Sequence, residues 1–279
     1  MDDNYQYPSM TPEGARLPNQ TKFHGKLIIT TCFYQAQSNS RYTQAMVATA
    51  GTLERLGVKW EFWPVHGDFH IERAANGALA KFMADPEATD ILMIDSDEAW
   101  DVMAVMRLIA SPHDVIACAY RMKNNWEKYT CALKWREDGV LDGYVGPDGK
   151  AVIRAERIPA GFLRLRKPPL EKFAESLPED QFYMDGDLRV PMFFHAAVRD
   201  HQFFSQDFEF SERMKALGVE LWIDPNGLVD HYGLTEYKGN LDAHLKGAAK
   251  AEKDRKAFEV VKGMAAEIEG RANASRAAA

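Results

Sequence analysis

The sequence predicts an α/β protein with a mostly parallel, Rossmann-like sheet, and two observations support this fold class. Apolar runs typical of buried strands occur at residues 26–33, 58–65, 91–94 and 115–120, and segments with helical spacing of apolar residues separate them. Strands that alternate with helices in this way are joined by right-handed crossovers and lie parallel. A chain of 279 residues, 46% of them hydrophobic, can bury the core that such a sheet needs.

Composition narrows the class of protein further. A net charge of −7 gives no general attraction for polyanions, so only a local basic patch could bind nucleic acid. Cys32, Cys118 and Cys131 are odd in number and lack C-x-x-C spacing, which favours reduced thiols in a core. The amino terminus has no apolar signal region, and no apolar run is long enough for a membrane span. We therefore expect a cytoplasmic protein without membrane contact.

The amino-terminal part begins with residues 1–21, where three prolines among polar residues predict an extended arm. After the first strand, Ser38 or Ser40 can cap a helix that ends at Gly57. The helix over residues 70–84 begins near the sheet's edge.

The third strand, residues 91–94, runs directly into Asp95-Ser96-Asp97. Ligands bind at the carboxyl ends of strands in open α/β sheets, and two neighbouring carboxylates there repel each other unless a cation offsets the repulsion. A hard divalent ion would do so. The alternative is an acidic loop in which one aspartate caps the next helix, and the motif alone does not decide between the two.

The pattern changes after residue 120. Residues 141–145 and 151–153 flank a Gly-Pro-Asp-Gly turn and predict a β-hairpin inserted over one face of the sheet. Another strand, residues 159–166, follows. Residues 151–170 hold five Lys or Arg against one Glu, which favours a solvated strand edge over an anion-binding surface.

The carboxyl-terminal part contains a helix over residues 205–218, where Ser205 can cap the helix and Asp207 lies in its first turn. A strand at residues 219–224 follows, and His231 lies just beyond it. Residues 241–279 predict a helix with a frayed end, which could dock on the body or form a homo-oligomer with a second copy.

Four short motifs follow one another in order along residues 26–240. They are the strand followed by Asp95-Ser96-Asp97, the glycine-led Gly161-Phe162, the helix start Ser205-Gln206-Asp207, and His231-Tyr232-Gly233. Together they resemble the ordered signature of GT-A fold glycosyltransferases, most of all the small soluble enzymes of phages and bacteria. The segment 71–76 is similar to that family's Arg-x-Arg-Asn element, although Ala75 stands where a second arginine is common.

The resemblance implies a catalytic domain over residues 22–240, with a donor half at about 22–120 and an acceptor half at about 121–240. It implies a nucleotide-sugar donor, most simply UDP-linked, and a Mn²⁺ or Mg²⁺ ion held by Asp95, Asp97 and His231. The cation would offset the charge that develops on the leaving nucleoside diphosphate. Asp207 would be the catalytic base, and the less favoured alternative is an aspartate at a helix start that only offsets the dipole.

The resemblance also assigns residues to the donor and the acceptor. The family commonly has Glu-Asp where this chain has Gln206-Asp207, which leaves one carboxylate instead of two. For Tyr34, a place in the core is an equal alternative. The expected donor-binding residues are Thr31, Tyr34, Arg73, Asn76, Asp95 and Ser96, and the expected acceptor-side residues are Gly161, Phe162 and Gln206.

The acceptor and the enzyme class have alternatives. Basic residues from Arg154 to Lys167, together with Arg121, Lys123 and Lys128, suggest contact with phage DNA that carries hydroxymethylated pyrimidines, although the net charge opposes this. A glycan, a protein or a small molecule is the runner-up. A sugar-nucleotidyltransferase shares the sheet but has a Gly-rich, Arg-containing loop where this chain reads Thr-Thr-Cys-Phe-Tyr-Gln. A non-catalytic domain that binds sugar-nucleotides is the remaining alternative.

Overall fold

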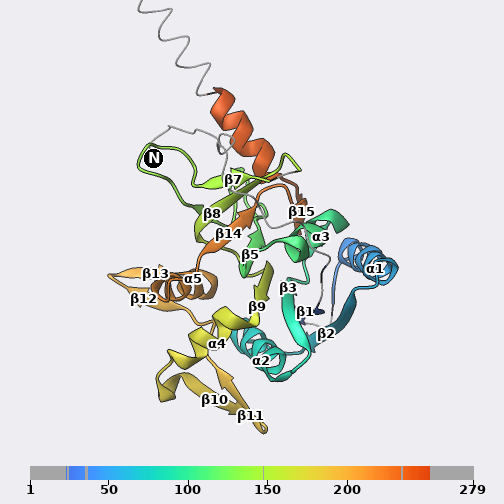
Figure 1. Ribbon diagram of the computed structural model, residues 1–279, viewed down its shortest axis with the longest axis vertical. Helices are drawn as coiled ribbons and strands as arrows, with labels where there is room; N and C mark the ends of the chain where they lie inside the picture. Colours follow the sequence, from blue (N-terminus) through green and yellow to red (C-terminus); the bar gives the residue numbers. More distant parts are fainter. Residues whose placement is uncertain (1–22, 24, 35–36, 147, 234, 252–279) are drawn as a thin grey trace, which may run out of the picture.

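The computed structural model describes residues 23, 25–34, 37–146, 148–233 and 235–251. Within them, a nine-stranded sheet runs in the order β2-β1-β3-β9-β5-β14-β8-β6, with β7 paired to β8 (Figure 1). All of its strands except β8 and β9 point the same way, which confirms the mostly parallel α/β prediction. The strands are β1 (Lys26–Phe33), β2 (Lys59–His66), β3 (Ala88–Ile94), β5 (Val115–Cys118), β6 (Ala132–Leu133), β7 (Gly143–Val145), β8 (Ala151–Arg157), β9 (Phe162–Arg166) and β14 (Leu221–Asp224).

Two features of this sheet go beyond or differ from the sequence prediction. β9 lies antiparallel between β3 and β5, and the apolar pattern had predicted this strand without a direction. The hairpin β7–β8 does not cover a face of the sheet. It extends the sheet, because β8 pairs antiparallel with β14 through Ile153, Arg154 and Ala155.

Helices cover both faces of the sheet. The alternation of side chains along β1 explains this, because Leu27 and Ile29 pack under α1 and α3 while Ile28 packs under the helices of the other face. Both faces of the central strands are therefore apolar. The helices are α1 (Ser40–Arg55) and α3 (Val102–Ala110) on one face, and α2 (Ile71–Ala84), α4 (Lys167–Glu175) and α5 (Gln206–Ala216) on the other.

The helix ends follow local chemistry. Asn39 caps α1, with its side-chain oxygen accepting a 2.8 Å hydrogen bond from the Tyr42 amide, so the predicted serine caps are wrong. Gly57 and Gly218 have φ of 65° and 75° and close α1 and α5 as predicted. Ser205 occupies the N-cap position of α5, but its hydroxyl donates to the Asp207 side chain instead of capping an amide.

Smaller sheets surround the central one. A three-stranded sheet in the order β16-β15-β4 adjoins the carboxyl end of β3, and two hairpins, β10–β11 and β12–β13, project from the body (Figure 1). The bounds are β4 (Glu98–Trp100), β15 (Val229–Tyr232), β16 (Glu236–Tyr237), β10 (Phe182–Asp185), β11 (Leu188–Pro191), β12 (Ala197–Arg199) and β13 (Gln202–Phe204), with a 3₁₀ helix at Glu179–Gln181.

Residues 241–251 are helical, and Asn240 caps them by accepting a 2.8 Å hydrogen bond from the Ala243 amide. Leu241 and Leu245 are buried in the core, so this segment docks on the body. The rest of the predicted tail and the arm at residues 1–21 lie outside the described residues, so an oligomer through this helix stays a prediction. No helix in the described part of the chain is long and apolar enough to cross a membrane.

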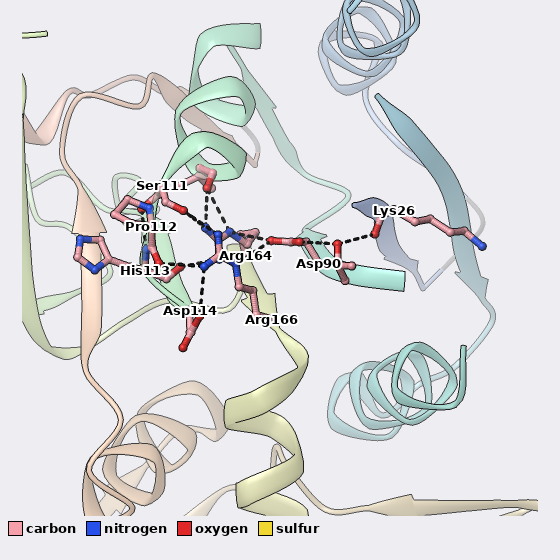
Figure 2. Close-up of polar contacts among 10 residues, drawn as sticks. Lys26, Asp90, Ser111, Pro112, His113, Asp114, Arg164 and Arg166 are labelled. Carbon is pink, nitrogen blue, oxygen red and sulfur yellow. Dashed lines mark hydrogen bonds and ion pairs between the residues drawn. The ribbon is translucent and has the colours of Figure 1, made fainter. Parts of the chain in front are cut away.

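Arg164 of β9 is fully buried and ties the sheet to the end of α3 (Figure 2). Its guanidinium donates to the carbonyls of Leu108, Ser111 and His113 at 2.5–3.1 Å, in the last turn of α3 and in the segment that follows it. Asp90 of β3 supplies the counter-charge at 3.5 Å. The network therefore joins β3, β9 and α3.

We expect Arg164→Met to lower the free energy of unfolding by about 3–5 kcal/mol, because it removes four buried hydrogen bonds to carbonyls and leaves only Arg166 to face the buried Asp90. Urea denaturation measures the change. The matched control is Arg136→Met, since Arg136 pairs with Asp138 on the surface and should contribute less than about 1 kcal/mol. Equal losses in the two variants would contradict a structural role for the network.

Candidate active site

The site lies where β3 ends, and two backbone pairings build it. The Asp95 amide donates to the Gly161 carbonyl at 2.8 Å, which joins the end of β3 to the start of β9. β15 then pairs antiparallel with β4, so that His231 lies opposite Glu98, and the Tyr232 amide donates to the Asp97 carbonyl at 2.7 Å. Residues far apart in the sequence therefore meet at this edge of the sheet.

The two carboxylate oxygens of Asp97 face different partners. Oδ2 forms an ion pair with the ammonium group of Lys123, and Oδ1 lies 3.7 Å from His231 Nε2. The His231 Nδ1–H donates to the Arg121 carbonyl at 3.0 Å, so Nε2 presents either a lone pair or a second proton to Asp97. Burial opposes ionisation of Asp97, but His231 and Lys123 outweigh it and lower the pKa of this carboxyl.

Asp95 has the opposite balance. Burial, followed by repulsion from Asp97 and from Asp207, raises the pKa of Asp95 to about 6, although His231 and Lys123 oppose the rise. This edge of the sheet therefore holds more negative charge than the nearby cations offset.

Glu98 and Tyr120 complete the buried part of the site. Neither carboxyl oxygen of Glu98 has a hydrogen bond of good geometry, and the Tyr120 hydroxyl is a nearby but poorly placed donor. Burial and repulsion from Asp95 and Asp97 raise the pKa of Glu98 well above its usual range. Neither residue was among those expected from the sequence. The signals were present, because Glu98 directly follows Asp97 and Tyr120 ends a predicted strand.

Gly161 lies against these groups. A Cβ atom added at this residue would lie 2.3 Å from the Tyr120 hydroxyl, 2.5 Å from Asp95 Oδ2 and 2.8 Å from Glu98 Oε1. Only a glycine lets the backbone approach this closely. The glycine predicted on the acceptor side thus also packs on the predicted metal ligand Asp95, and Phe162 beside it is buried in the core against Trp100.

Asp207 lies in the first turn of α5 and faces the same cluster. Its carboxylate accepts hydrogen bonds from the Ser205 hydroxyl and, at 3.0 Å, from the Phe208 amide. Burial nevertheless raises the pKa of Asp207, and its charge repels that of Asp95. A partly buried carboxylate with a raised pKa is suited to accept a proton. Gln206, beside it, is the first residue of α5 and is half-buried.

The expected donor-binding residues fall into two groups. Arg73 is exposed and forms a two-pronged ion pair with Asp68 at 2.8 and 2.9 Å, and Tyr34 is 53% exposed. Thr31 is buried and shares a 2.7 Å hydrogen bond with the Tyr42 hydroxyl.

Asn76 is also buried. Its side-chain NH₂ donates to the Phe194 carbonyl at 2.9 Å, and its side-chain oxygen accepts from the Phe194 amide at 2.7 Å. Its place in this structure is therefore to hold the Phe194 segment. Ser96 is half-buried, between the two aspartates at the end of β3.

The chemistry of the donor set fits a divalent cation. Asp95 and Asp97 supply carboxylate oxygens, the charge of Asp95 is poorly offset, and His231 presents Nε2 while its other nitrogen bonds to a carbonyl, as metal-binding histidines do. The positions of these side chains do not by themselves form a metal site. In the part of the chain that the structure describes, no three His, Cys, Asp or Glu side chains are arranged to hold a metal ion.

Comparisons with known proteins give a loose likeness of fold. No family model matches the chain, and no curated protein matches it. Among solved structures, A197 from STIV is 13% identical, with a TM-score of 0.43, covering 78% of this chain and 95% of that one. The catalytic domain of Drosophila beta1,4galactosyltransferase 7, in complex with xylobiose, is 14% identical, with a TM-score of 0.41 and coverage of 73% and 66%.

A putative glucose-1-phosphate thymidylyltransferase from Bacillus anthracis, in complex with sucrose, is 10% identical, with a TM-score of 0.29 and coverage of 56% and 77%. The neighbours thus include a glycosyltransferase catalytic domain and a nucleotidyltransferase. At these scores the likeness does not establish an activity.

We expect Gly161→Ala to destabilise the fold by about 1–3 kcal/mol, because the new methyl group must displace three polar side chains. Thermal or urea unfolding measures this. Gly77→Ala is the control: Gly77 lies inside α2 with open space around it, so alanine there should stabilise by about 0.5–1 kcal/mol. If Gly161→Ala were as stable as wild type, the glycine would not be needed for the close approach of the backbone to these side chains.

The pKa shifts of the two aspartates predict opposite effects of amidation. The folded state holds the Asp95 proton to about pH 6 and the unfolded chain only to about 3.8, so this carboxyl makes the protein less stable as pH rises between these values. Above pH 6, Asp95→Asn should therefore be more stable than wild type, by on the order of 1–3 kcal/mol, and the gain should vanish below about pH 4.

Asp97→Asn is the matched control. The lowered pKa of Asp97 gives stability that is present above its unfolded pKa and lost in acid, so this variant should be less stable than wild type at pH 7. Thermal unfolding from pH 4 to 8 without divalent cations tests both variants. If both variants were more stable than wild type at pH 7, or both less stable, the pKa shifts assigned to these two aspartates would be wrong.

Proposed function

We propose that this chain is a glycosyltransferase that moves a sugar from a nucleotide-sugar to an acceptor hydroxyl with the aid of a divalent cation. One observation carries the proposal: Asp95 and Asp97 at the end of β3 lie beside His231, and the charge of Asp207 acts on Asp95. Such a concentration of partly buried acid costs stability unless positive charge arrives with a ligand. A diphosphate with its cation brings that charge.

Asp95, Asp97 and His231 would hold Mn²⁺, or Mg²⁺, which supplies positive charge for the departing diphosphate. The imidazole among the ligands favours Mn²⁺. Arg73 and Tyr34, exposed at the edge of the sheet, are the proposed contacts to a UDP-linked donor.

Asp207 is the proposed base. The acceptor oxygen attacks the anomeric carbon and the carbon–oxygen bond to the diphosphate breaks, while the hydroxyl proton passes to the Asp207 carboxylate. The Ser205 hydroxyl and the Phe208 amide hold this carboxylate in place. With Asp207 acting as a base in this way, the anomeric configuration is inverted.

The acceptor is best described as a hydroxyl group of a glycan, protein or small molecule. A DNA acceptor would depend on the basic stretch from Arg154 to Lys167, and its arginines are paired inside the protein. Their partners are Asp142 and Glu220 for Arg154, Glu212 for Arg157, Asp90 for Arg164, and Asp90 and Asp114 for Arg166.

A panel of nucleotide-sugars with Mn²⁺ tests the proposal. We expect release of nucleoside diphosphate from one donor, most simply a UDP-sugar, and its loss on chelation or in Asp97→Ala and His231→Ala. Release of pyrophosphate from a nucleoside triphosphate and a sugar phosphate would instead identify a nucleotidyltransferase. No turnover of any donor would favour a non-catalytic domain. Hydroxymethylated DNA among the acceptors tests the DNA alternative directly.

In the same assay, Asp207→Asn should lower kcat by about 10²–10⁴-fold, because no carboxylate then takes the proton of the attacking hydroxyl. Mn²⁺ should still bind, because Asp207 is not among the proposed ligands. Thermal unfolding of Asp207→Asn is the control for local disturbance of α5. If Asp207→Asn retained wild-type kcat, Asp207 would not be the base.

A further inference from the structure

Lys123 is a cation that the fold itself places at the cluster. Its ammonium group pairs with Asp97 Oδ2, the oxygen that does not face His231. The same charge opposes the rise in the pKa of Asp95 and of the buried Glu98 and helps to lower the pKa of Asp97. One lysine thus reduces the repulsion among three carboxyl groups.

The position of Lys123 is built into the structure. The isolated bridge between Arg121 and Tyr129 and a 2.8 Å hydrogen bond from the Met122 amide to the Lys128 carbonyl hold its segment. Its aliphatic stem lies over Gly233, where an added Cβ atom would be 3.3 Å from Lys123 Cδ. The Arg121 carbonyl of this segment also accepts the Nδ1–H of His231.

From this geometry we propose that Lys123 is the resident counter-ion of the site. It holds Asp97 while the site lacks a divalent cation and, once the cation takes Asp97, its ammonium group contacts the diphosphate of the donor. The inference rests on the proposed function. It adds a residue that competes with the cation and assists the leaving group.

Two properties of the lysine support this exchange. Its side chain is 34% exposed and that of Asp97 is 43% exposed, so the ion pair is weak enough to open. A long, flexible side chain with a point charge can then turn from a carboxylate to a phosphate oxygen without moving the backbone.

Lys123→Met gives two changes of opposite sign. Mn²⁺ alone should bind about threefold to tenfold more tightly than to wild type, because a competing cation is gone from Asp97. UDP, added at saturating Mn²⁺, should bind about tenfold more weakly because one charge-assisted contact is lost. Titration calorimetry measures both, with the electron paramagnetic resonance signal of free Mn²⁺ as a second readout.

Two variants control the experiment. Lys128→Met removes the same charge from the same segment; Lys128 forms no ion pair in the described residues, and both affinities should stay at wild-type values. Lys123→Arg keeps the charge and should stay close to wild type, which separates charge loss from misfolding.

The outcomes distinguish this inference from the proposed function. Mn²⁺ affinity that is the same in wild type, Lys123→Met and Lys128→Met would overturn the role of Lys123 and leave the metal site standing. Weaker Mn²⁺ binding to Lys123→Met would also overturn it, because a competitor cannot aid the cation. No Mn²⁺ binding to either wild type or Lys123→Met would overturn both the inference and the metal-dependent function.

Discussion

The crowding of acid at the end of β3 is the constraint on which the rest of the site depends. Asp97 stays ionised because it has Lys123 and His231, whereas Asp95 and Glu98 are left with raised pKa values. A folded chain that retains this imbalance gives up stability at neutral pH. Such a cost is typical of sites that await a ligand of opposite charge.

Backbone pairing, more than loop conformation, brings the groups together. β4 is only three residues long, yet its pairing with β15 sets His231 beside Asp97, and β9 sets Gly161 against Asp95. The side chains around the cluster therefore inherit the order of the sheet. Gly161 adds the steric part, because its missing side chain makes room for three polar groups.

The sequence predicted the long elements and the strand that ends at Asp95, since apolar periodicity and the ends of strands are local properties. It could not predict the direction of β9, because an antiparallel strand between parallel ones has the same apolar residues. The pairing of β4 with β15 has no periodic signal in three residues, so the place of His231 rested on a family resemblance. The sequence around Asn76 was compatible with donor binding. Only the fold shows that the Phe194 backbone occupies both the NH₂ group and the oxygen of its side chain.

The position of β9 has a mechanical consequence. It is hydrogen-bonded on one side to β3, which carries the aspartates, and on the other to β5, which leads into the Lys123 segment. A hinge between the two sides would have to break a continuous ladder, and Arg164 clamps the same strands to α3. The sheet therefore acts as a fixed frame, and any movement that admits or releases a ligand belongs to the segments mounted on it, such as the turn that carries Lys123.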